Sequence, residues 1–139
     1  MDGVLSDAVQ SYGILLRLMM LPEDERFFHS LVVSNSWGMF HPTWDFPSGH
    51  PGRYFDNPNH PFNRIVGSLA TAGADILFAA GNCGPACPDG RCLPIPANPN
   101  DRRISGANGH PDVYSVAGVD TNRDLVGYST QGPGALAQQ

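Results

Sequence analysis

The sequence predicts an α/β fold in which a short parallel β-sheet is flanked by helices. Two apolar segments, residues 31–36 and 75–80, have the composition of buried strands, and a helical pattern over residues 61–72 separates them. A strand, a helix and a second strand in this order are typical of a right-handed crossover between parallel strands. Because 139 residues suffice for one domain and are few for two, we treat residues 1–139 as part of a single domain.

The first helix is predicted over residues 4–21, where apolar side chains recur at helical spacing. Asp2 and Ser6 are its candidate N-caps, and Pro22 closes it. Residues 23–29 are predicted to add a further helical turn.

The second helix has clearer boundaries. Asn59 is the predicted N-cap, Pro61 fits the first turn, and Gly73 supplies a left-handed stop. Its apolar face repeats at i, i+3, i+4 and i+7, through Phe62, Ile65, Val66 and Leu69.

The strands on either side of this helix are nearly continuously apolar, which is typical of a parallel sheet covered on both faces. Residues 114–119 predict a third core strand. Residues 125–130 predict a fourth, joined to the third by turn residues 120–124. Most of the thirteen prolines lie in two windows, residues 38–64 and 81–112, which we interpret as elaborated loops.

Composition excludes several classes of partner. The formal net charge of −5 argues against nucleic acid and against an anionic membrane surface. The apolar stretch at residues 14–21 is interrupted by Arg17 and is too short to span a bilayer. We therefore expect no nucleic-acid partner and no membrane partner.

The segment Ile76 to Asn82, ILFAAGN, is a strand that ends abruptly at Gly81 and Asn82. Ligands of open parallel sheets bind beyond the carboxyl ends of the strands, and the other such end is Ser36-Trp37-Gly38. We expect the two strand ends to lie side by side. Glycine there lets a substrate backbone approach, and the Asn82 amide can stabilise an oxyanion without titrating. The alternative is an ordinary turn that begins at Gly81.

Three cysteines, Cys83, Cys87 and Cys92, lie within ten residues. An odd number allows one disulfide with a free thiol, or three thiols. A loop-closing disulfide is favoured over a zinc site, because the spacing lacks the Cys-x-x-Cys pattern and zinc needs a fourth ligand. The candidates for that ligand are His41, His50 and His60.

Four motifs carry a resemblance to a known family. They are VVSNSWG (32–38), ILFAAGN (76–82), HPDVYSVAGVD (110–120) and GYSTQGP (127–133). In this order and spacing the sequence resembles the middle of a subtilisin-like serine protease (subtilase) catalytic domain. The resemblance implies a partial subtilisin-like fold and makes the chain a central fragment of that domain.

The resemblance also implies roles for individual residues. Asn82 matches the oxyanion-hole asparagine of the family. The segment Ser36, Trp37 and Gly38 matches the strand that pairs with substrate and forms one wall of the first specificity pocket. The facing wall would be Ala79, Ala80 and Gly81.

The family's catalytic Asp, His and Ser are expected outside these residues, so the isolated chain should not hydrolyse peptides. Ser129 lies in Tyr-Ser-Thr-Gln rather than in the family's Gly-Thr-Ser turn, and His29 is predicted at the buried start of a strand. The other histidines each precede a proline, which biases them toward extended backbone: His41, His50, His60 and His110.

The resemblance implies peptide or protein substrates, no cofactor in this chain, calcium in a full-length parent and a secreted or extracytoplasmic location. Apolar surface left uncovered in a fragment would favour self-association. Two alternatives stay open: a non-catalytic, protease-derived peptide-binding protein, and a small Cys/His metal-binding module.

Overall fold

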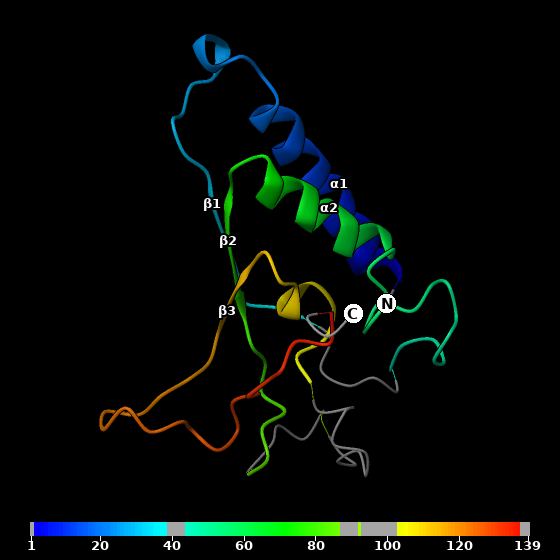
Figure 1. Cartoon of the computed structure of the whole chain (residues 1–139), viewed down its shortest axis with the longest axis vertical. Helices are drawn as coiled ribbons and strands as arrows, with labels where there is room; N and C mark the ends of the chain where they lie inside the picture. Colours follow the sequence, from blue (N-terminus) through cyan, green and yellow to red (C-terminus); the bar gives the residue numbers. More distant parts are fainter. Residues whose placement is uncertain (1, 39–43, 87–91, 93–102, 137–139) are drawn as a thin grey trace.

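The computed structural model describes residues 2–38, 44–86, 92 and 103–136. It confirms the α/β class. Two helices and a three-stranded parallel sheet of order β1-β2-β3 form the body of the molecule (Figure 1). In chain order the elements are α1 (Asp2–Met19), η1 (Glu23–Glu25), β1 (Val32–Asn35), α2 (Pro61–Thr71), β2 (Asp75–Ala79), η5 (Gly106–Gly109) and β3 (Tyr114–Val116).

The helix ends differ in detail from the predicted ones. Ser6 lies inside α1, so it is not the N-cap. The N-cap of α2 is His60 rather than Asn59, because the His60 Nδ1 accepts the Phe62 N–H at 3.2 Å. The predicted stop at Gly73 is confirmed by its φ of 98°.

The core lies between the two helices and one face of the sheet. Phe62 of α2 is fully buried, and its ring lies 5.1 Å from Tyr12 of α1. The Trp37 ring packs 5.3 Å from Phe62 and 5.9 Å from Phe78 of β2. Such aromatic contacts bury large apolar areas in defined geometries. The core therefore holds Trp37, which follows β1, in a fixed place.

The sheet register brings the carboxyl ends of β1 and β2 level with each other. Asn35, the last residue of β1, pairs with Phe78, and Ala79 pairs with Val116 of β3. The Asn35 side chain adds a bond between the strands, because its Nδ2 donates to the Leu77 carbonyl at 3.1 Å. The chain segments that leave β1 and β2 therefore start from the same edge.

The opposite face of the sheet is open, so coverage on both faces was a wrong prediction for the described residues. Both helices pack on the same face (Figure 1). Val32, Tyr114 and Val116 are each more than half exposed. The third strand is therefore not a core strand in this chain, although its composition is apolar.

The fourth strand, expected over residues 125–130, was also a wrong prediction. Within the described residues this segment meets the end of the third predicted strand at one isolated bridge, Val119 with Leu125. It pairs instead with the loop that follows β2. Three backbone bonds make this pairing: Thr130 N to Gly81 O, Gly84 N to Tyr128 O, and Ala86 N to Gly127 O.

Candidate functional site

A cavity of about 260 Å³ lies at the carboxyl edge of β1 and β2. All seven residues singled out at the two strand ends line it, and two further residues complete the wall. The lining residues are Ser36, Trp37, Gly38, Ala79, Ala80, Gly81, Asn82, Ser105 and Asn108. The structure thus brings the two strand ends together around one hollow, while their roles toward a substrate stay predictions.

Asn108 ties the two walls of the cavity together. Its Nδ2 donates to the carbonyl oxygens of Trp37 and Ala79, each at 2.9 Å. Asn108 is only 4% exposed, so the donor end of these part-buried bonds is shielded from water. Gly38 permits this arrangement, because a Cβ there would lie 2.6 Å from the Asn108 Nδ2.

Asn108 is held in turn by its own surroundings. The Ser115 Oγ donates to the Asn108 backbone carbonyl, and the Tyr54 hydroxyl lies 3.5 Å from the Asn108 Oδ1. Tyr54 also accepts the Ala107 N–H at 3.0 Å. Burial raises the pKa of Tyr54, so its hydroxyl keeps its proton at neutral pH. The hydrogen-bond network that holds Asn108 is therefore neutral.

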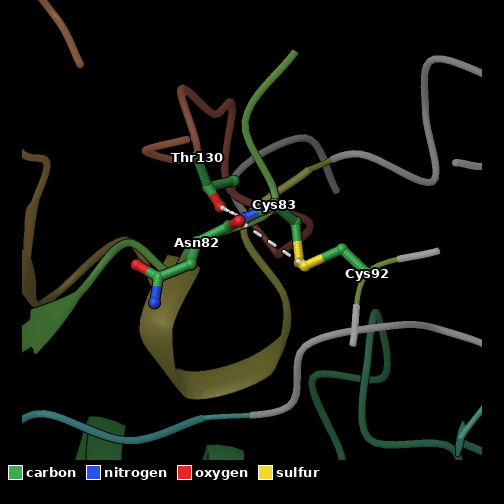
Figure 2. The surroundings of a disulfide bond; sticks show 4 residues. All are labelled: Asn82, Cys83, Cys92 and Thr130. Carbon is green, nitrogen blue, oxygen red and sulfur yellow. Dashed lines mark hydrogen bonds between the residues drawn. A yellow bond between two sulfur atoms is a disulfide. The ribbon is translucent and has the colours of Figure 1, made fainter. Parts of the chain in front are cut away.

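Asn82 is placed by the turn that ends β2. Gly81 has a φ of 101°, a region that side chains other than glycine rarely adopt. Asn82 is half-buried, and its carboxamide points away from the neighbouring disulfide (Figure 2). Within the part of the chain that the structure describes, no group hydrogen-bonds to this carboxamide. Its two N–H donors are available to a ligand in the cavity.

The loop after Asn82 is cross-linked. Cys83 and Cys92 form a disulfide with a Cα–Cα distance of 5.5 Å, and the Cys92 Sγ lies 3.5 Å from the Asn82 carbonyl oxygen (Figure 2). The loop-closing disulfide is thus the alternative that the structure contains. Cys87, the third cysteine of the prediction, lies outside the described residues.

The structure gives no catalytic pairing of Ser129 with His29, the one histidine that does not precede a proline. Ser129 is 3% exposed, and its Oγ accepts the Gly118 N–H at 2.9 Å, so it is a buried structural hydroxyl. His29 is exposed and lies outside any strand, contrary to its predicted buried position.

The histidines that precede prolines serve the local backbone. His60 and His110 have the expected extended backbone, with ψ of 135° and 140°. Each uses Nδ1 as an acceptor, for the N–H of Phe62 and of Asp112 respectively. Burial lowers the pKa of both, against the opposing effect of a nearby aspartate. His50 likewise accepts the Gly52 N–H, and His41 lies outside the described residues.

The described residues contain no group of three or more His, Cys, Asp or Glu side chains that could hold a metal ion. The Cys83–Cys92 disulfide also uses two of the three thiolates that a zinc site would need. Among the same residues, no helix is long and apolar enough to cross a membrane.

Sequence reasoning missed Ser105, Asn108 and Thr130. Ser105 and Asn108 line the cavity from η5 and its N-cap, which precede β3, and Thr130 bonds to the backbone on either side of Asn82. A faint signal was present, since Asn108 stands among small residues in Gly106–Gly109, a composition that favours tight turns.

Comparison with known proteins adds no further assignment. Neither the protein-family models nor the curated proteins include a match to this sequence.

Proposed function

We propose that this chain forms the oxyanion-hole and substrate-binding part of a subtilisin-like serine endopeptidase. The catalytic Asp, His and Ser would come from residues outside it. The observation that carries the proposal is the cavity itself: the seven residues matched to the family's motifs line one hollow. Among them is Asn82, whose carboxamide hydrogen-bonds to none of the described residues.

In this function the attacking serine converts a peptide carbonyl into a tetrahedral intermediate with a negative oxygen. The Asn82 Nδ2 donates a hydrogen bond to that oxygen. Because an amide carries no titratable proton, the donor is present at every physiological pH. A preorganised donor of this kind stabilises the transition state more than the bound substrate.

The substrate backbone would pair with the segment that leaves β1. The Trp37 carbonyl is bonded to Asn108 on the β2 side. Because successive backbone groups of an extended segment point to opposite sides, we propose that those of Ser36 and Gly38 face the substrate rather than β2. β1 is an edge strand of the described sheet, which favours addition of an extended peptide on that side.

The chemistry of the cavity indicates the side chain that the first specificity pocket would accept. No charged side chain is among the lining residues that the structure describes. Burying a charged substrate side chain there would carry a large desolvation penalty without a partner. We therefore propose an uncharged side chain at the cleaved position.

Location and cofactors follow from the same residues. The Cys83–Cys92 disulfide supports a secreted or extracytoplasmic protein, since disulfides persist in oxidising compartments. Oxyanion stabilisation by an amide requires no metal at this cavity, and calcium in a longer parent remains part of the proposal.

The test uses the isolated chain and two N-acetylated tetrapeptides that end in leucine, one as a carboxylate and one as a carboxamide. The carboxylate imitates the negative oxygen of the intermediate. Titrations followed by ¹⁵N NMR should show tighter binding of the carboxylate by about tenfold or more, since a hydrogen bond to a charged group contributes about 1.5–3 kcal/mol.

Asn82→Ala should abolish this preference and leave the carboxamide affinity nearly unchanged. An equal preference in variant and wild type would refute the role of Asn82. Binding of both peptides without any preference would favour the non-catalytic peptide-binding alternative. In a longer enzyme with the full triad, Asn82→Ala should lower kcat by about 10²–10³, the loss known for subtilisin itself, with little change in KM.

A further inference from the structure

Thr130 holds the backbone on both sides of Asn82. Its N–H donates to the Gly81 carbonyl at 3.0 Å. Its Oγ1 accepts the Cys83 N–H at 3.0 Å (Figure 2). Thr130 is 4% exposed, so its own ends of both bonds are buried. One buried residue, 47 positions away from Cys83 in the chain, therefore contacts both neighbours of Asn82.

These two bonds fix the orientation of Asn82 for a geometric reason. The Gly81 carbonyl belongs to the peptide unit that precedes the Asn82 Cα, and the Cys83 N–H belongs to the unit that follows it. Since a peptide unit is planar, fixing both units leaves little freedom for the φ and ψ of Asn82. The direction of its Cα–Cβ bond is fixed with them, so only the two side-chain torsions are left to orient the carboxamide.

The surrounding residues are arranged to permit this contact. Gly81 carries no Cβ, and an added Cβ would lie only 3.1 Å from the Thr130 Oγ1. The segment that contains Thr130 is itself anchored, because the Tyr128 carbonyl accepts the Gly84 N–H at 2.8 Å. At Gly84 a Cβ would lie 2.4 Å from the Ser129 carbonyl oxygen, so glycine is needed for the two segments to meet.

Cys83 is thus restrained from two directions. Its N–H is bonded to Thr130, and its Sγ is bonded to Cys92 (Figure 2). The disulfide restrains the Cys83 side chain, and its Cys92 Sγ also lies 3.5 Å from the Asn82 carbonyl oxygen. The Thr130 hydroxyl accepts the N–H of the same peptide unit. Thr130 differs from the disulfide because it bonds to the peptide units on both sides of Asn82.

We propose that Thr130 is the positioning residue for Asn82, whose amide its hydroxyl aims into the cavity. This role rests on the proposed function of Asn82 as the donor to a developing negative charge. Thr130 itself touches no substrate.

Two substitutions separate the hydroxyl from the rest of the side chain. Thr130→Ser keeps the hydroxyl acceptor, and Thr130→Val keeps the shape but removes the acceptor. The first measurement needs no ligand: the ¹⁵N order parameters of the Asn82 backbone and side-chain amides. We expect about 0.85 for the backbone amide in wild type and in Thr130→Ser, and a fall below about 0.6 in Thr130→Val. The side-chain amide should lose order in the same variant.

The second measurement is the ratio of carboxylate to carboxamide peptide affinity defined above. Thr130→Ser should retain the wild-type ratio within about twofold, and Thr130→Val should lose most of it. In the Asn82→Ala background, Thr130→Val should leave the ratio unchanged, because residues that act as a unit are non-additive. Urea titrations confirm that every variant is folded under the conditions of the measurement.

The outcomes are distinct. If Asn82→Ala abolishes the ratio but Thr130→Val preserves it, Thr130 is a structural residue only and the inference is wrong. Unchanged order parameters in Thr130→Val would also overturn it, whatever the peptides do. If wild type itself shows no ratio that depends on Asn82, the proposed function fails, and the order parameters still decide whether Thr130 restrains Asn82.

Discussion

Asn108→Asp should destabilise the protein by an amount that the structure allows us to work out. The substitution keeps the size of the side chain but replaces the Nδ2 donor with an oxygen that faces the carbonyls of Trp37 and Ala79. Two bonds of 2.9 Å are lost at a site that is 4% exposed. At a net value of about 1 kcal/mol each, with a further cost for carbonyls left unpaired, we expect a loss of about 2–4 kcal/mol at pH 7.

The loss should shrink in acid. A buried carboxylate beside two carbonyl oxygens has a raised pKa in the folded state, so the folded variant binds more protons than the unfolded variant as the pH falls. The protonated acid can also donate one bond in place of the amide. Urea titrations of variant and wild type, compared at pH 7 and at pH 5, measure the difference at each pH.

A matched control separates the site from the charge. Asn122 is exposed, and its contact with Asp120 uses only its backbone N–H, so Asn122→Asp should change stability by less than about 0.5 kcal/mol. If Asn108→Asp is no more destabilising than this control, or if its loss is the same at both pH values, then Asn108 does not tie the cavity walls as described.

Two further predictions concern stability. Burial lowers the pKa of His60, whose Nδ1 caps α2, so the free energy of unfolding should fall as the pH drops below about 6.5. His60→Asn keeps a capping side chain, so urea titrations at pH 7.5 and 5.5 should show a smaller difference in unfolding free energy for the variant than for wild type. An equal difference would show that His60 does not cause the loss of stability in acid. Replacing Cys83 and Cys92 by serine should reduce the free energy of unfolding by about 2.5 kcal/mol, the chain-entropy value for a loop of this length, with Cys87→Ser as the control. Equal stability of the double variant and wild type would show that the disulfide does not constrain the unfolded chain.

The two strand ends could be predicted because their placement follows from local pattern and general topology. An apolar run that stops at Gly81 indicates where a strand ends, and a helix between two strands indicates that they are parallel. Parallel neighbours have their carboxyl ends at one edge. Ser36 and Asn82 therefore had to lie near one another if both strands existed and were adjacent.

The residues that complete the cavity could not be found in this way. Asn108 reaches Trp37 across 71 positions and Ala79 across 29, and no periodicity connects them. Thr130 lies in a segment whose composition predicts a strand, but that segment pairs with the loop after β2. This pairing depends on the close approach of the two segments at Gly84, which is a tertiary contact that strand propensity does not encode.

The open face of the sheet illustrates a second limit. The apolar character of Val32 and Val116 correctly indicates strands, but composition does not say what packs against them. Likewise, the N-cap of α2 moved by one residue to His60 because its ring nitrogen, like the Asn59 side chain, can accept a backbone N–H.

Three asparagine side chains lie at the same edge of the sheet, but they differ in whether their amides are hydrogen-bonded to the protein. The Asn35 amide donates to a β2 carbonyl, and the Asn108 amide donates to carbonyls of β2 and of the segment after β1. Both amides therefore hold this edge of the sheet together. The half-buried Asn82 amide bonds to none of the described residues. Removing an amide that holds the fold together should lower the free energy of unfolding of the free protein. Removing an amide that serves only a ligand should not. Asn82→Ala, which we expect to abolish the preference for a carboxylate, should therefore alter the free energy of unfolding by less than about 0.5 kcal/mol. A loss as large as that of Asn108→Asp would mean that Asn82 supports the fold.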